Sequence, residues 1–142
     1  MKQNKRSILE RDLRKVISPK QAVGKVAQQL IIRLLQLPKE KLGKFYFDDL
    51  AKLVDVSVGR DDFINGVFVL LGPDVNVLAQ KFEAYTGKQG EYSPVDGVTI
   101  TKILQSKNYI NPVTSEKLTE EQFSEQVLIY FEVTDKFWGN YQ

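Results

Sequence analysis

The apolar pattern between Ala22 and Leu37 is the feature that most restricts how this chain can fold. Apolar residues recur there at helical spacing and form one broad stripe. The members of the stripe are Val23, Val26, Ala27, Leu30, Ile31, Leu34 and Leu35. Ser18-Pro19 with Gln21 predicts the start of this helix, and Leu37-Pro38 predicts its end. We expect the stripe to lie in the core of the protein, and a dimer seam is the alternative.

The same segment is the longest apolar run, and polar residues interrupt it at Lys25, Gln28, Gln29 and Arg33. No run approaches the roughly 20 residues that a membrane-spanning helix needs. The charged N-terminus is not followed by the apolar stretch of a secretory signal. We therefore expect a cytoplasmic protein of bacterial or viral origin that has no membrane partner.

Further capping signals divide the rest of the chain into helices. Ser7 with Glu10 forms one capping box, and Thr119 with Gln122 forms another, next to a hydrophobic staple of Leu118 and Phe123. The first box predicts a helix buried through Leu9, Leu13, Val16 and Ile17. The second box predicts a final helix with an inner face of Phe123, Val127, Tyr130 and Phe131. Between them we expect helices at 48–54 and 60–71, joined by a turn at 56–59.

Two segments combine signals of a helix with signals of a strand. Residues 75–85 show helical spacing together with β-branched and aromatic content, and we interpret them as a strand that turns at 87–90. Residues 94–106 begin like a helix yet alternate like a strand at 98–101, and we interpret them as a helix. The aromatic run 45–47 has the size of one strand rung. The predicted fold is therefore mostly α with a small β-hairpin, an α+β class.

The chain ends in three aromatic residues, Phe137, Trp138 and Tyr141. Chain ends fray unless they are tied down, so we expect these aromatics to dock on the core. An exposed anchor for a partner is the alternative.

The chain contains no cysteine and no histidine. Thiol nucleophiles, histidine bases, disulfides and nearly all zinc sites are therefore excluded. A Mg²⁺-dependent nuclease built on Asp48-Asp49 or Asp61-Asp62 is the alternative that carboxylates leave open. Adjacent residues on a helix diverge by about 100°, and each pair suits a helix first turn, where negative charge complements the dipole. We therefore predict a protein that is not an enzyme and that uses no cofactor and no metal.

Basic residues are concentrated at the N-terminal end. Residues 1–44 hold 12 of the 20 Lys and Arg and only three acidic residues, whereas residues 45–142 hold eight basic and 15 acidic residues. Clustered positive charge suits phosphate contacts, which give affinity without sequence information. The candidate phosphate-binding residues are Lys2, Lys5, Arg6, Arg11, Arg14, Lys15, Lys20 and Lys25. The alternatives are an acidic protein partner, the acidic face of a second copy in a homodimer, and a solvated face.

The order of elements predicted over residues 19–92 resembles the winged helix, a variant of the helix-turn-helix. The resemblance is carried by FDDLAKLVDVSVGRDDFINGVFVLL (47–71), with Leu50-Ala51 in the first helix and Val56-Ser57 at the turn. Asp55 stands where helix-turn-helix proteins usually have glycine. We expect residues 1–18 to form a basic N-terminal arm or helix. Residues 19–142 should form a single winged-helix-like domain with a C-terminal helical extension.

In DNA-binding members of that family, the second helix of the motif enters the major groove. The resemblance places Arg60, Asp61, Asp62 and Asn65 at its exposed positions. Arg60 suits guanine and Asn65 suits adenine, whereas the two aspartates would repel phosphates. We expect a non-catalytic DNA-binding protein with mainly non-specific phosphate contacts, such as a small regulator or a phage or plasmid accessory factor. The alternative is a protein-interaction module, an adaptor or inhibitor, that uses the winged-helix scaffold and its acidic face.

Overall fold

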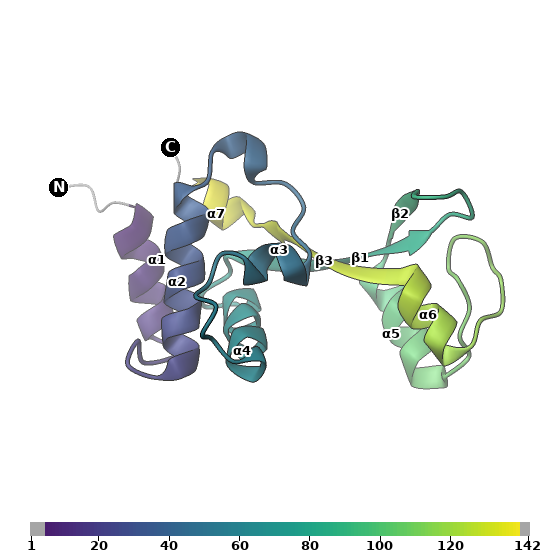
Figure 1. Ribbon diagram of the computed structural model, residues 1–142, viewed down its shortest axis with the longest axis horizontal. Helices are drawn as coiled ribbons and strands as arrows, with labels where there is room; N and C mark the ends of the chain where they lie inside the picture. The colour runs from purple at the N-terminus through teal and green to yellow at the C-terminus, as the bar shows by residue number, and fades with distance from the viewer. Residues whose placement is uncertain (1–4, 140–142) are drawn as a thin grey trace. The chain divides into compact units, whose positions relative to one another are not determined.

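The computed structural model describes residues 5–139, and the chain divides into two compact units. Unit 1 comprises Met1–Ala79 and Phe131–Gln142, and unit 2 comprises Gln80–Tyr130. The described residues hold seven α-helices and one three-stranded sheet (Figure 1), so the predicted α+β class is confirmed. Among residues 5–139, no helix is both long enough and apolar enough to cross a membrane.

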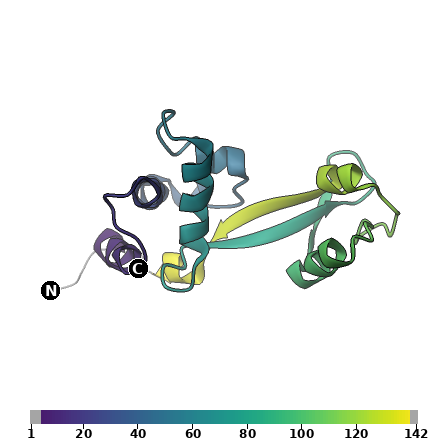
Figure 2. The same cartoon turned by 90° about the horizontal axis from the view of Figure 1, so that it is seen from below.

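Three helices form the body of unit 1: α1 (Lys5–Arg14), α2 (Ala22–Gln36) and α4 (Arg60–Leu71). Helix α2 packs against both α1 and α4 and lies between them in Figures 1 and 2. Helix α4 approaches α2 closely at Gly66, where a Cβ atom would lie 2.5 Å from Cγ1 of Val26. The other helical elements of unit 1 are short: η1 (Lys39–Lys41), α3 (Phe47–Ala51) and α7 (Asp135–Gly139).

The apolar stripe of α2 lies in the core of unit 1, as predicted. Its buried members are Val26, Ala27, Leu30, Ile31 and Leu34. They share one cluster with Leu9 and Leu13 of α1 and with Phe63, Val67 and Leu70 of α4. Phe137 is fully buried in this cluster and Trp138 packs against it, which confirms the predicted docking of these two aromatics. Tyr141 lies outside the described residues.

Two helices begin at other positions than their capping signals predicted. Ser7 lies inside α1, and Glu10 accepts a hydrogen bond from Arg6 at 2.7 Å instead of capping the helix start. Helix α2 begins at Ala22, because Ser18 organises a separate turn. Its hydroxyl accepts from the Lys20 N–H and its carbonyl accepts from the Gln21 N–H. Both predictions were wrong, since serine and proline favour turns as well as helix starts.

The region of the predicted aromatic rung forms a single β-bridge. Phe45 and Phe131 exchange two backbone hydrogen bonds of 2.9 and 2.7 Å, and Phe47 already belongs to α3. Helix α3 ends at Ala51 rather than at residue 54. The connection to α4 therefore runs over residues 52–59 and is longer than the predicted turn at 56–59.

The sheet contains β1 (Leu78–Tyr85), β2 (Tyr92–Val95) and β3 (Val127–Val133) in the order β2-β1-β3. β1 and β2 are antiparallel, with Phe82 opposite Val95 and Tyr85 opposite Tyr92. The strand predicted over 75–85 is therefore confirmed from Leu78 onward, and its turn at 87–90 is confirmed.

The last predicted helix is only partly correct. Thr119 and Gln122 do form the reciprocal capping box, with distances of 2.9 and 3.1 Å, and begin α6 (Glu120–Gln126). The chain then continues as β3, so Val127, Tyr130 and Phe131 do not lie on a helix face. The run from Val127 to Phe131 is rich in β-branched and aromatic residues, which favour a strand once β1 offers a pairing partner.

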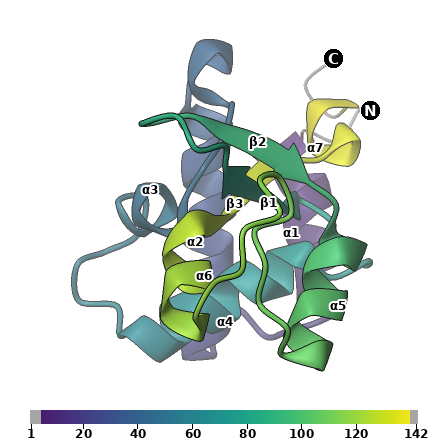
Figure 3. The same cartoon turned by 90° about the vertical axis from the view of Figure 1, so that its right-hand side faces the viewer.

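Unit 2 contains α5 (Gly97–Ser106), α6, β2 and β1 from Gln80 onward (Figure 3). The Asp96 carboxylate accepts from the Val98 N–H at 2.9 Å and caps α5. The helix interpretation of 94–106 is thus confirmed from Gly97 onward, whereas Pro94 lies in β2. Ile100, Ile103 and Phe123 form a separate small core, and Leu118 packs against it, in keeping with the predicted staple.

Lys136 joins three segments of unit 1. Its Nζ lies 2.7 Å from Oδ2 of Asp12, whose side chain is only 11% exposed. It also donates to the carbonyl oxygens of Asp74 and Val75, at 3.2 and 2.8 Å. The hydrogen bond from Lys136 lowers the pKa of Asp12, and the neighbouring positive charges of Lys15 and Arg11 act in the same direction against the effect of burial. Helix α1 is therefore attached to α7 and to the α4–β1 connection through one ammonium group.

We expect Lys136→Met to lower the free energy of unfolding by about 2 kcal/mol at neutral pH, because it removes the donor from a buried carboxylate. The folded-state pKa of Asp12 lies below its unfolded value of 3.8. Its contribution is therefore present above about pH 4 and is lost as the pH falls through the folded pKa. Urea unfolding followed by circular dichroism should show a large gap between wild type and variant at pH 7 and a smaller gap at pH 3. Lys102→Met, at an exposed lysine of α5, is the control; equal gaps at both pH values would contradict this role.

Candidate functional site

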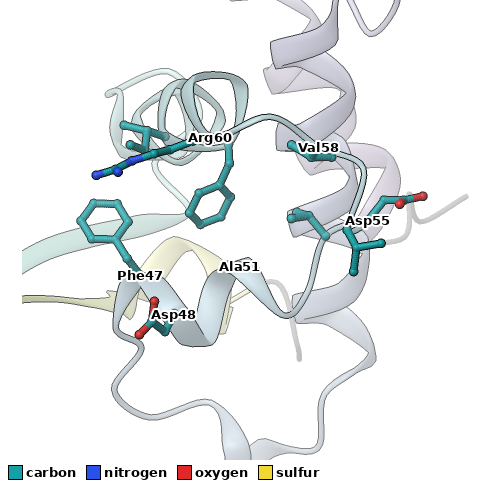
Figure 4. Close-up of a pocket in the computed structure, with 10 residues that line it drawn as sticks. Phe47, Asp48, Ala51, Asp55, Val58 and Arg60 are labelled. Carbon is teal, nitrogen blue, oxygen red and sulfur yellow. The ribbon is translucent and has the colours of Figure 1, made fainter.

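A pocket of about 710 Å³ lies between α3, the 52–59 connection and α4 of unit 1 (Figure 4). Its volume falls within the range of about 300–1,000 Å³ that is typical of ligand sites. Most of its lining is apolar, and its charged members are Asp48, Asp55 and Arg60. The lining residues are Phe47, Asp48, Ala51, Val54, Asp55, Val56, Val58, Arg60, Phe63 and Ile64.

Aromatic packing supports one wall of the pocket. The Phe47 ring packs edge-to-face on Phe63, with centroids 6.4 Å apart, and on Phe131, with centroids 4.9 Å apart. Phe63 and Phe131 are buried in the core of unit 1. This edge-to-face packing connects the Phe47 side of the pocket to the core of unit 1.

The 52–59 connection is shaped by Asp55. One carboxylate oxygen, Oδ1, accepts from both the backbone N–H and the hydroxyl of Ser57, each at 3.0 Å. These hydrogen bonds lower the pKa of Asp55. The Asp55 N–H donates to Oε1 of Gln29 at 3.3 Å, which attaches the connection to α2. The φ angle of Asp55 is not positive, so this turn does not need the glycine that helix-turn-helix proteins usually have there.

Both aspartate pairs occupy helix first turns, as the sequence predicted. Asp49 Oδ2 accepts from the Tyr46 N–H at 2.9 Å at the start of α3, and Asp61 and Asp62 lie in the first turn of α4. Within residues 5–139, no group of three acidic side chains could hold a metal ion. Of these four aspartates, Asp48 lines the pocket, as does Ala51 of the same helix (Figure 4).

Apolar side chains also stand exposed beside the pocket. Val56 is fully exposed in the connection, and Phe68 of α4 is 48% exposed. Phe68 follows Ile64 by one helical turn, so the two side chains are neighbours on α4. Sequence reasoning missed this surface. The signal was the alternation of Val54, Val56 and Val58 in the connection: Val54 and Val58 pack against the core of unit 1, whereas Val56 does not.

The two predicted base-reading residues lie on α4, as expected, and both are exposed. Arg60 lines the pocket, as Figure 4 shows, whereas Asn65 does not. The exposed neighbours of Asn65 on α4 are Asp61 and Phe68. The outer face of α4 is therefore acidic and apolar rather than basic.

The predicted phosphate-binding residues fall in three groups. Lys2 lies outside the described residues, and Lys5 begins α1. Arg6, Arg11 and Lys15 have acidic neighbours: Arg6 lies 2.7 Å from Glu10, and Arg11 and Lys15 lie 3.8 and 3.6 Å from Asp12. Arg14, Lys20 and Lys25 are exposed, and the ion pairs found within residues 5–139 include none of them.

Arg14, Lys20 and Lys25 belong to the end of the α1–α2 hairpin, and we call them the basic turn. Arg14 closes α1, Lys20 lies in the seven-residue connection 15–21, and Lys25 lies near the start of α2. Since α1 and α2 pack together, this short connection keeps the three side chains at one end of the hairpin. The helix dipole accounts in part for Arg14, because cations are favoured at a helix C-terminus.

The comparisons with known proteins give no relative. The chain matches no protein-family model, and neither a curated protein nor a solved structure is significantly similar to it. The winged-helix resemblance of residues 19–92 therefore remains a prediction.

Proposed function

We propose that the protein is a non-catalytic protein-interaction module that binds an apolar segment of its partner in the α3–α4 pocket. The supporting observation is the open apolar pocket, which is lined by the fully exposed Val56 and by Ile64, whose neighbour one turn further along α4 is the exposed Phe68. Exposed apolar side chains beside a concave site are typical of protein-binding surfaces. The wall formed by Phe47 and Phe63 gives such a segment a prearranged aromatic contact.

The charges at this surface define the partner further. Asp48 and Asp55 line the pocket, and the exposed Asp61 follows directly in the first turn of α4. Arg60 is the basic residue among the pocket-lining side chains, so the surface is acidic on balance. Opposite charge across an interface steers association and excludes wrong partners. The bound segment should therefore combine an apolar anchor with Lys or Arg.

A displayed library of random peptides tests this function without knowledge of the partner. We expect the wild type to select peptides that carry an aromatic or aliphatic anchor next to basic residues. Ala51→Phe places a bulky side chain at the pocket from an exposed position of α3, and should weaken the selected peptides at least tenfold, about 1.4 kcal/mol. Fluorescence anisotropy of a labelled peptide measures both Kd values.

Ala22→Phe is the matched control, because Ala22 is also exposed and helical but does not line the pocket. It should bind the same peptides as tightly as the wild type does. Selection of purely acidic peptides, or equal affinity of the Ala51 and Ala22 variants, would show that the pocket is not the binding site.

Non-specific nucleic-acid binding is the second candidate, and the basic turn favours it. Arg14, Lys20 and Lys25 are exposed and belong to one end of the α1–α2 hairpin, and such clustered positive charge suits contact with phosphates. The acidic outer face of α4 does not favour major-groove entry, so this candidate uses the α1–α2 hairpin and not α4. The expected binding is independent of base sequence.

Salt dependence tests this second candidate. Replacing Arg14, Lys20 and Lys25 together by Gln should reduce the magnitude of the slope of log K against log salt by about 2.7, because each phosphate contact contributes about 0.9 to that slope. Electrophoretic shifts with random duplex DNA over a series of salt concentrations measure the slope. The control replaces the exposed Lys102, Lys107 and Lys117 of unit 2 by Gln. An unchanged slope in the basic-turn variant would remove this candidate.

A further inference from the structure

The two signs of charge are separated within unit 1. Residues 1–44 hold 12 basic and three acidic residues, whereas residues 45–79 and 131–142 hold three basic and eight acidic residues. Both parts belong to the same compact unit. The division follows the helices, because α1 and α2 belong to the basic part and α3 and α4 to the acidic part.

Helix α2 separates the basic turn from the pocket. Gln28 of α2 contacts Glu10 of α1, with Nε2 and Oε1 3.5 Å apart. The next residue, Gln29, accepts from the N–H of Asp55 in the 52–59 connection. Successive helix residues point about 100° apart, so α1 and the pocket region occupy different sides of α2. Figure 2, in which α2 is seen nearly end-on, shows α1 and α4 on either side of it.

An exposed apolar side chain, Val16, lies between the residues of the basic turn. Val16 lies just after the end of α1, whose last turn is basic, and it is 49% exposed, so its predicted burial on a helix face is wrong. Arg14 and Lys15 precede Val16 and Lys20 follows it. Such a segment, an exposed apolar residue flanked by cations, matches an apolar pocket with aspartates at its edge.

We propose that the partner of the α3–α4 pocket is the basic turn of a second copy of this chain. This inference rests on the proposed function and names the occupant of the same pocket. In the contact, Val16 of one copy enters the pocket of the next, and Arg14 and Lys20 approach Asp48 and Asp55. The contact is head-to-tail, because its two surfaces differ.

A two-fold dimer through the pocket is the competing arrangement, and charge opposes it. A two-fold axis there would bring each surface against its own copy, so that Asp48, Asp55 and Asp61 would face like charges. Head-to-tail contact instead pairs opposite charges at every interface. Because such contacts repeat unless the rotation closes a ring, the assembly grows with protein concentration.

Two variants that each lack one surface test the arrangement. The first changes Arg14, Lys20 and Lys25 to Glu and keeps the pocket. The second combines Ala51→Phe with Asp48→Lys and keeps the basic turn. All five positions are exposed, so neither variant alters the core, and circular dichroism checks that both are folded.

Sedimentation velocity at protein concentrations up to about 1 mM gives the outcome. The wild type should form oligomers of increasing mass at low ionic strength, and these should dissociate at about 0.5 M salt, where charges are strongly screened. Each variant alone should be a monomer. An equimolar mixture should form a particle of twice the monomer mass and nothing larger, because one basic turn meets one pocket and both ends are then blocked.

Three results would overturn the proposal: a monomeric wild type at all concentrations, continued self-association of either variant alone, or no complex in the mixture. The proposed function is judged separately by the peptide selection. If the wild type is monomeric and still binds basic peptides in a manner that depends on Ala51, the pocket is a docking site for another protein. If the wild type is monomeric and the peptide selection also gives no binding that depends on Ala51, the pocket binds neither a second copy nor another protein.

Discussion

Gly24→Ala is expected to lower the free energy of unfolding of unit 1 by about 1–3 kcal/mol. A Cβ atom at Gly24 would overlap the carbonyl oxygen of Ser18 and would lie 2.9 Å from its carbonyl carbon and 3.3 Å from Cα of Pro19. These are backbone atoms, so a side-chain rotation cannot relieve the contact. Either the turn at Ser18–Gln21 moves away from α2 or the first turn of α2 unwinds.

The direction of the change makes this prediction decisive. Gly24 is inside a helix, where alanine is intrinsically better than glycine by about 1 kcal/mol. Propensity alone therefore predicts a more stable protein, and the close backbone contact predicts a less stable one. Urea unfolding followed by the fluorescence of Trp138, the single tryptophan, reports on unit 1 because that ring packs against its core.

Gly43→Ala is the matched control, since a Cβ atom there would meet nothing within 4 Å. It should change the midpoint little. A Gly24 variant as stable as the Gly43 variant would show that the Ser18 turn can shift at no cost. The position of Lys20 in the basic turn would then also be adaptable, which would weaken the geometric basis of the head-to-tail contact.

The sequence predicted the elements of unit 1 better than their boundaries. The stripe of α2 identified the core because seven apolar residues at helical spacing cannot all be solvated at low cost. Ser7 and Ser18 misplaced two helix starts, because a serine hydroxyl forms the same local hydrogen bonds in a turn as in a cap. Such signals identify a boundary between secondary-structure elements, and tertiary packing decides at which residue the next helix begins.

The strand β3 shows a different limit of sequence reasoning. Thr119 and Gln122 correctly predicted where α6 begins, yet the neighbouring sequence contains no glycine or proline that would predict its end at Gln126. The spacing of Phe123, Val127, Tyr130 and Phe131 suits a helix face. The same segment becomes a strand because β1, more than 40 residues earlier, supplies its hydrogen-bonding partner. Non-local pairing of this kind overrides local period.

The candidate site was only partly accessible from the sequence. Arg60 was identified through the winged-helix resemblance and does line the pocket, together with Asp48. The three residues of the basic turn were among the candidate phosphate-binding residues. The ion pairs of Arg11 and Lys15 with Asp12 were not predicted, because they depend on how α1 is oriented. The pocket itself was missed, since it arises from the space between α3, the 52–59 connection and α4.

Asn111→Ala is expected to destabilise unit 2 by roughly 3 kcal/mol, because four polar groups lose their partner. The fully buried Asn111 side chain donates from Nδ2 to the carbonyl of Tyr85 at 2.9 Å and to Oε1 of Gln126 at 2.8 Å. Its Oδ1 accepts from the N–H groups of Val113 and Thr114, at 2.8 and 3.0 Å. One side chain thus joins β1, α6 and the 107–119 connection.

All these partners belong to unit 2, whereas the pocket and the basic turn belong to unit 1. Hydrogen exchange should therefore show faster exchange over residues 80–130 in the Asn111 variant and unchanged protection of α2. Asn108→Ala, at an exposed position of the same connection, should leave both units as they are. Peptide binding in the α3–α4 pocket should persist in the Asn111 variant, because unit 1 alone supplies that site. Loss of α2 protection or of peptide binding would mean that the two units unfold together, and the binding function would then depend on the whole chain.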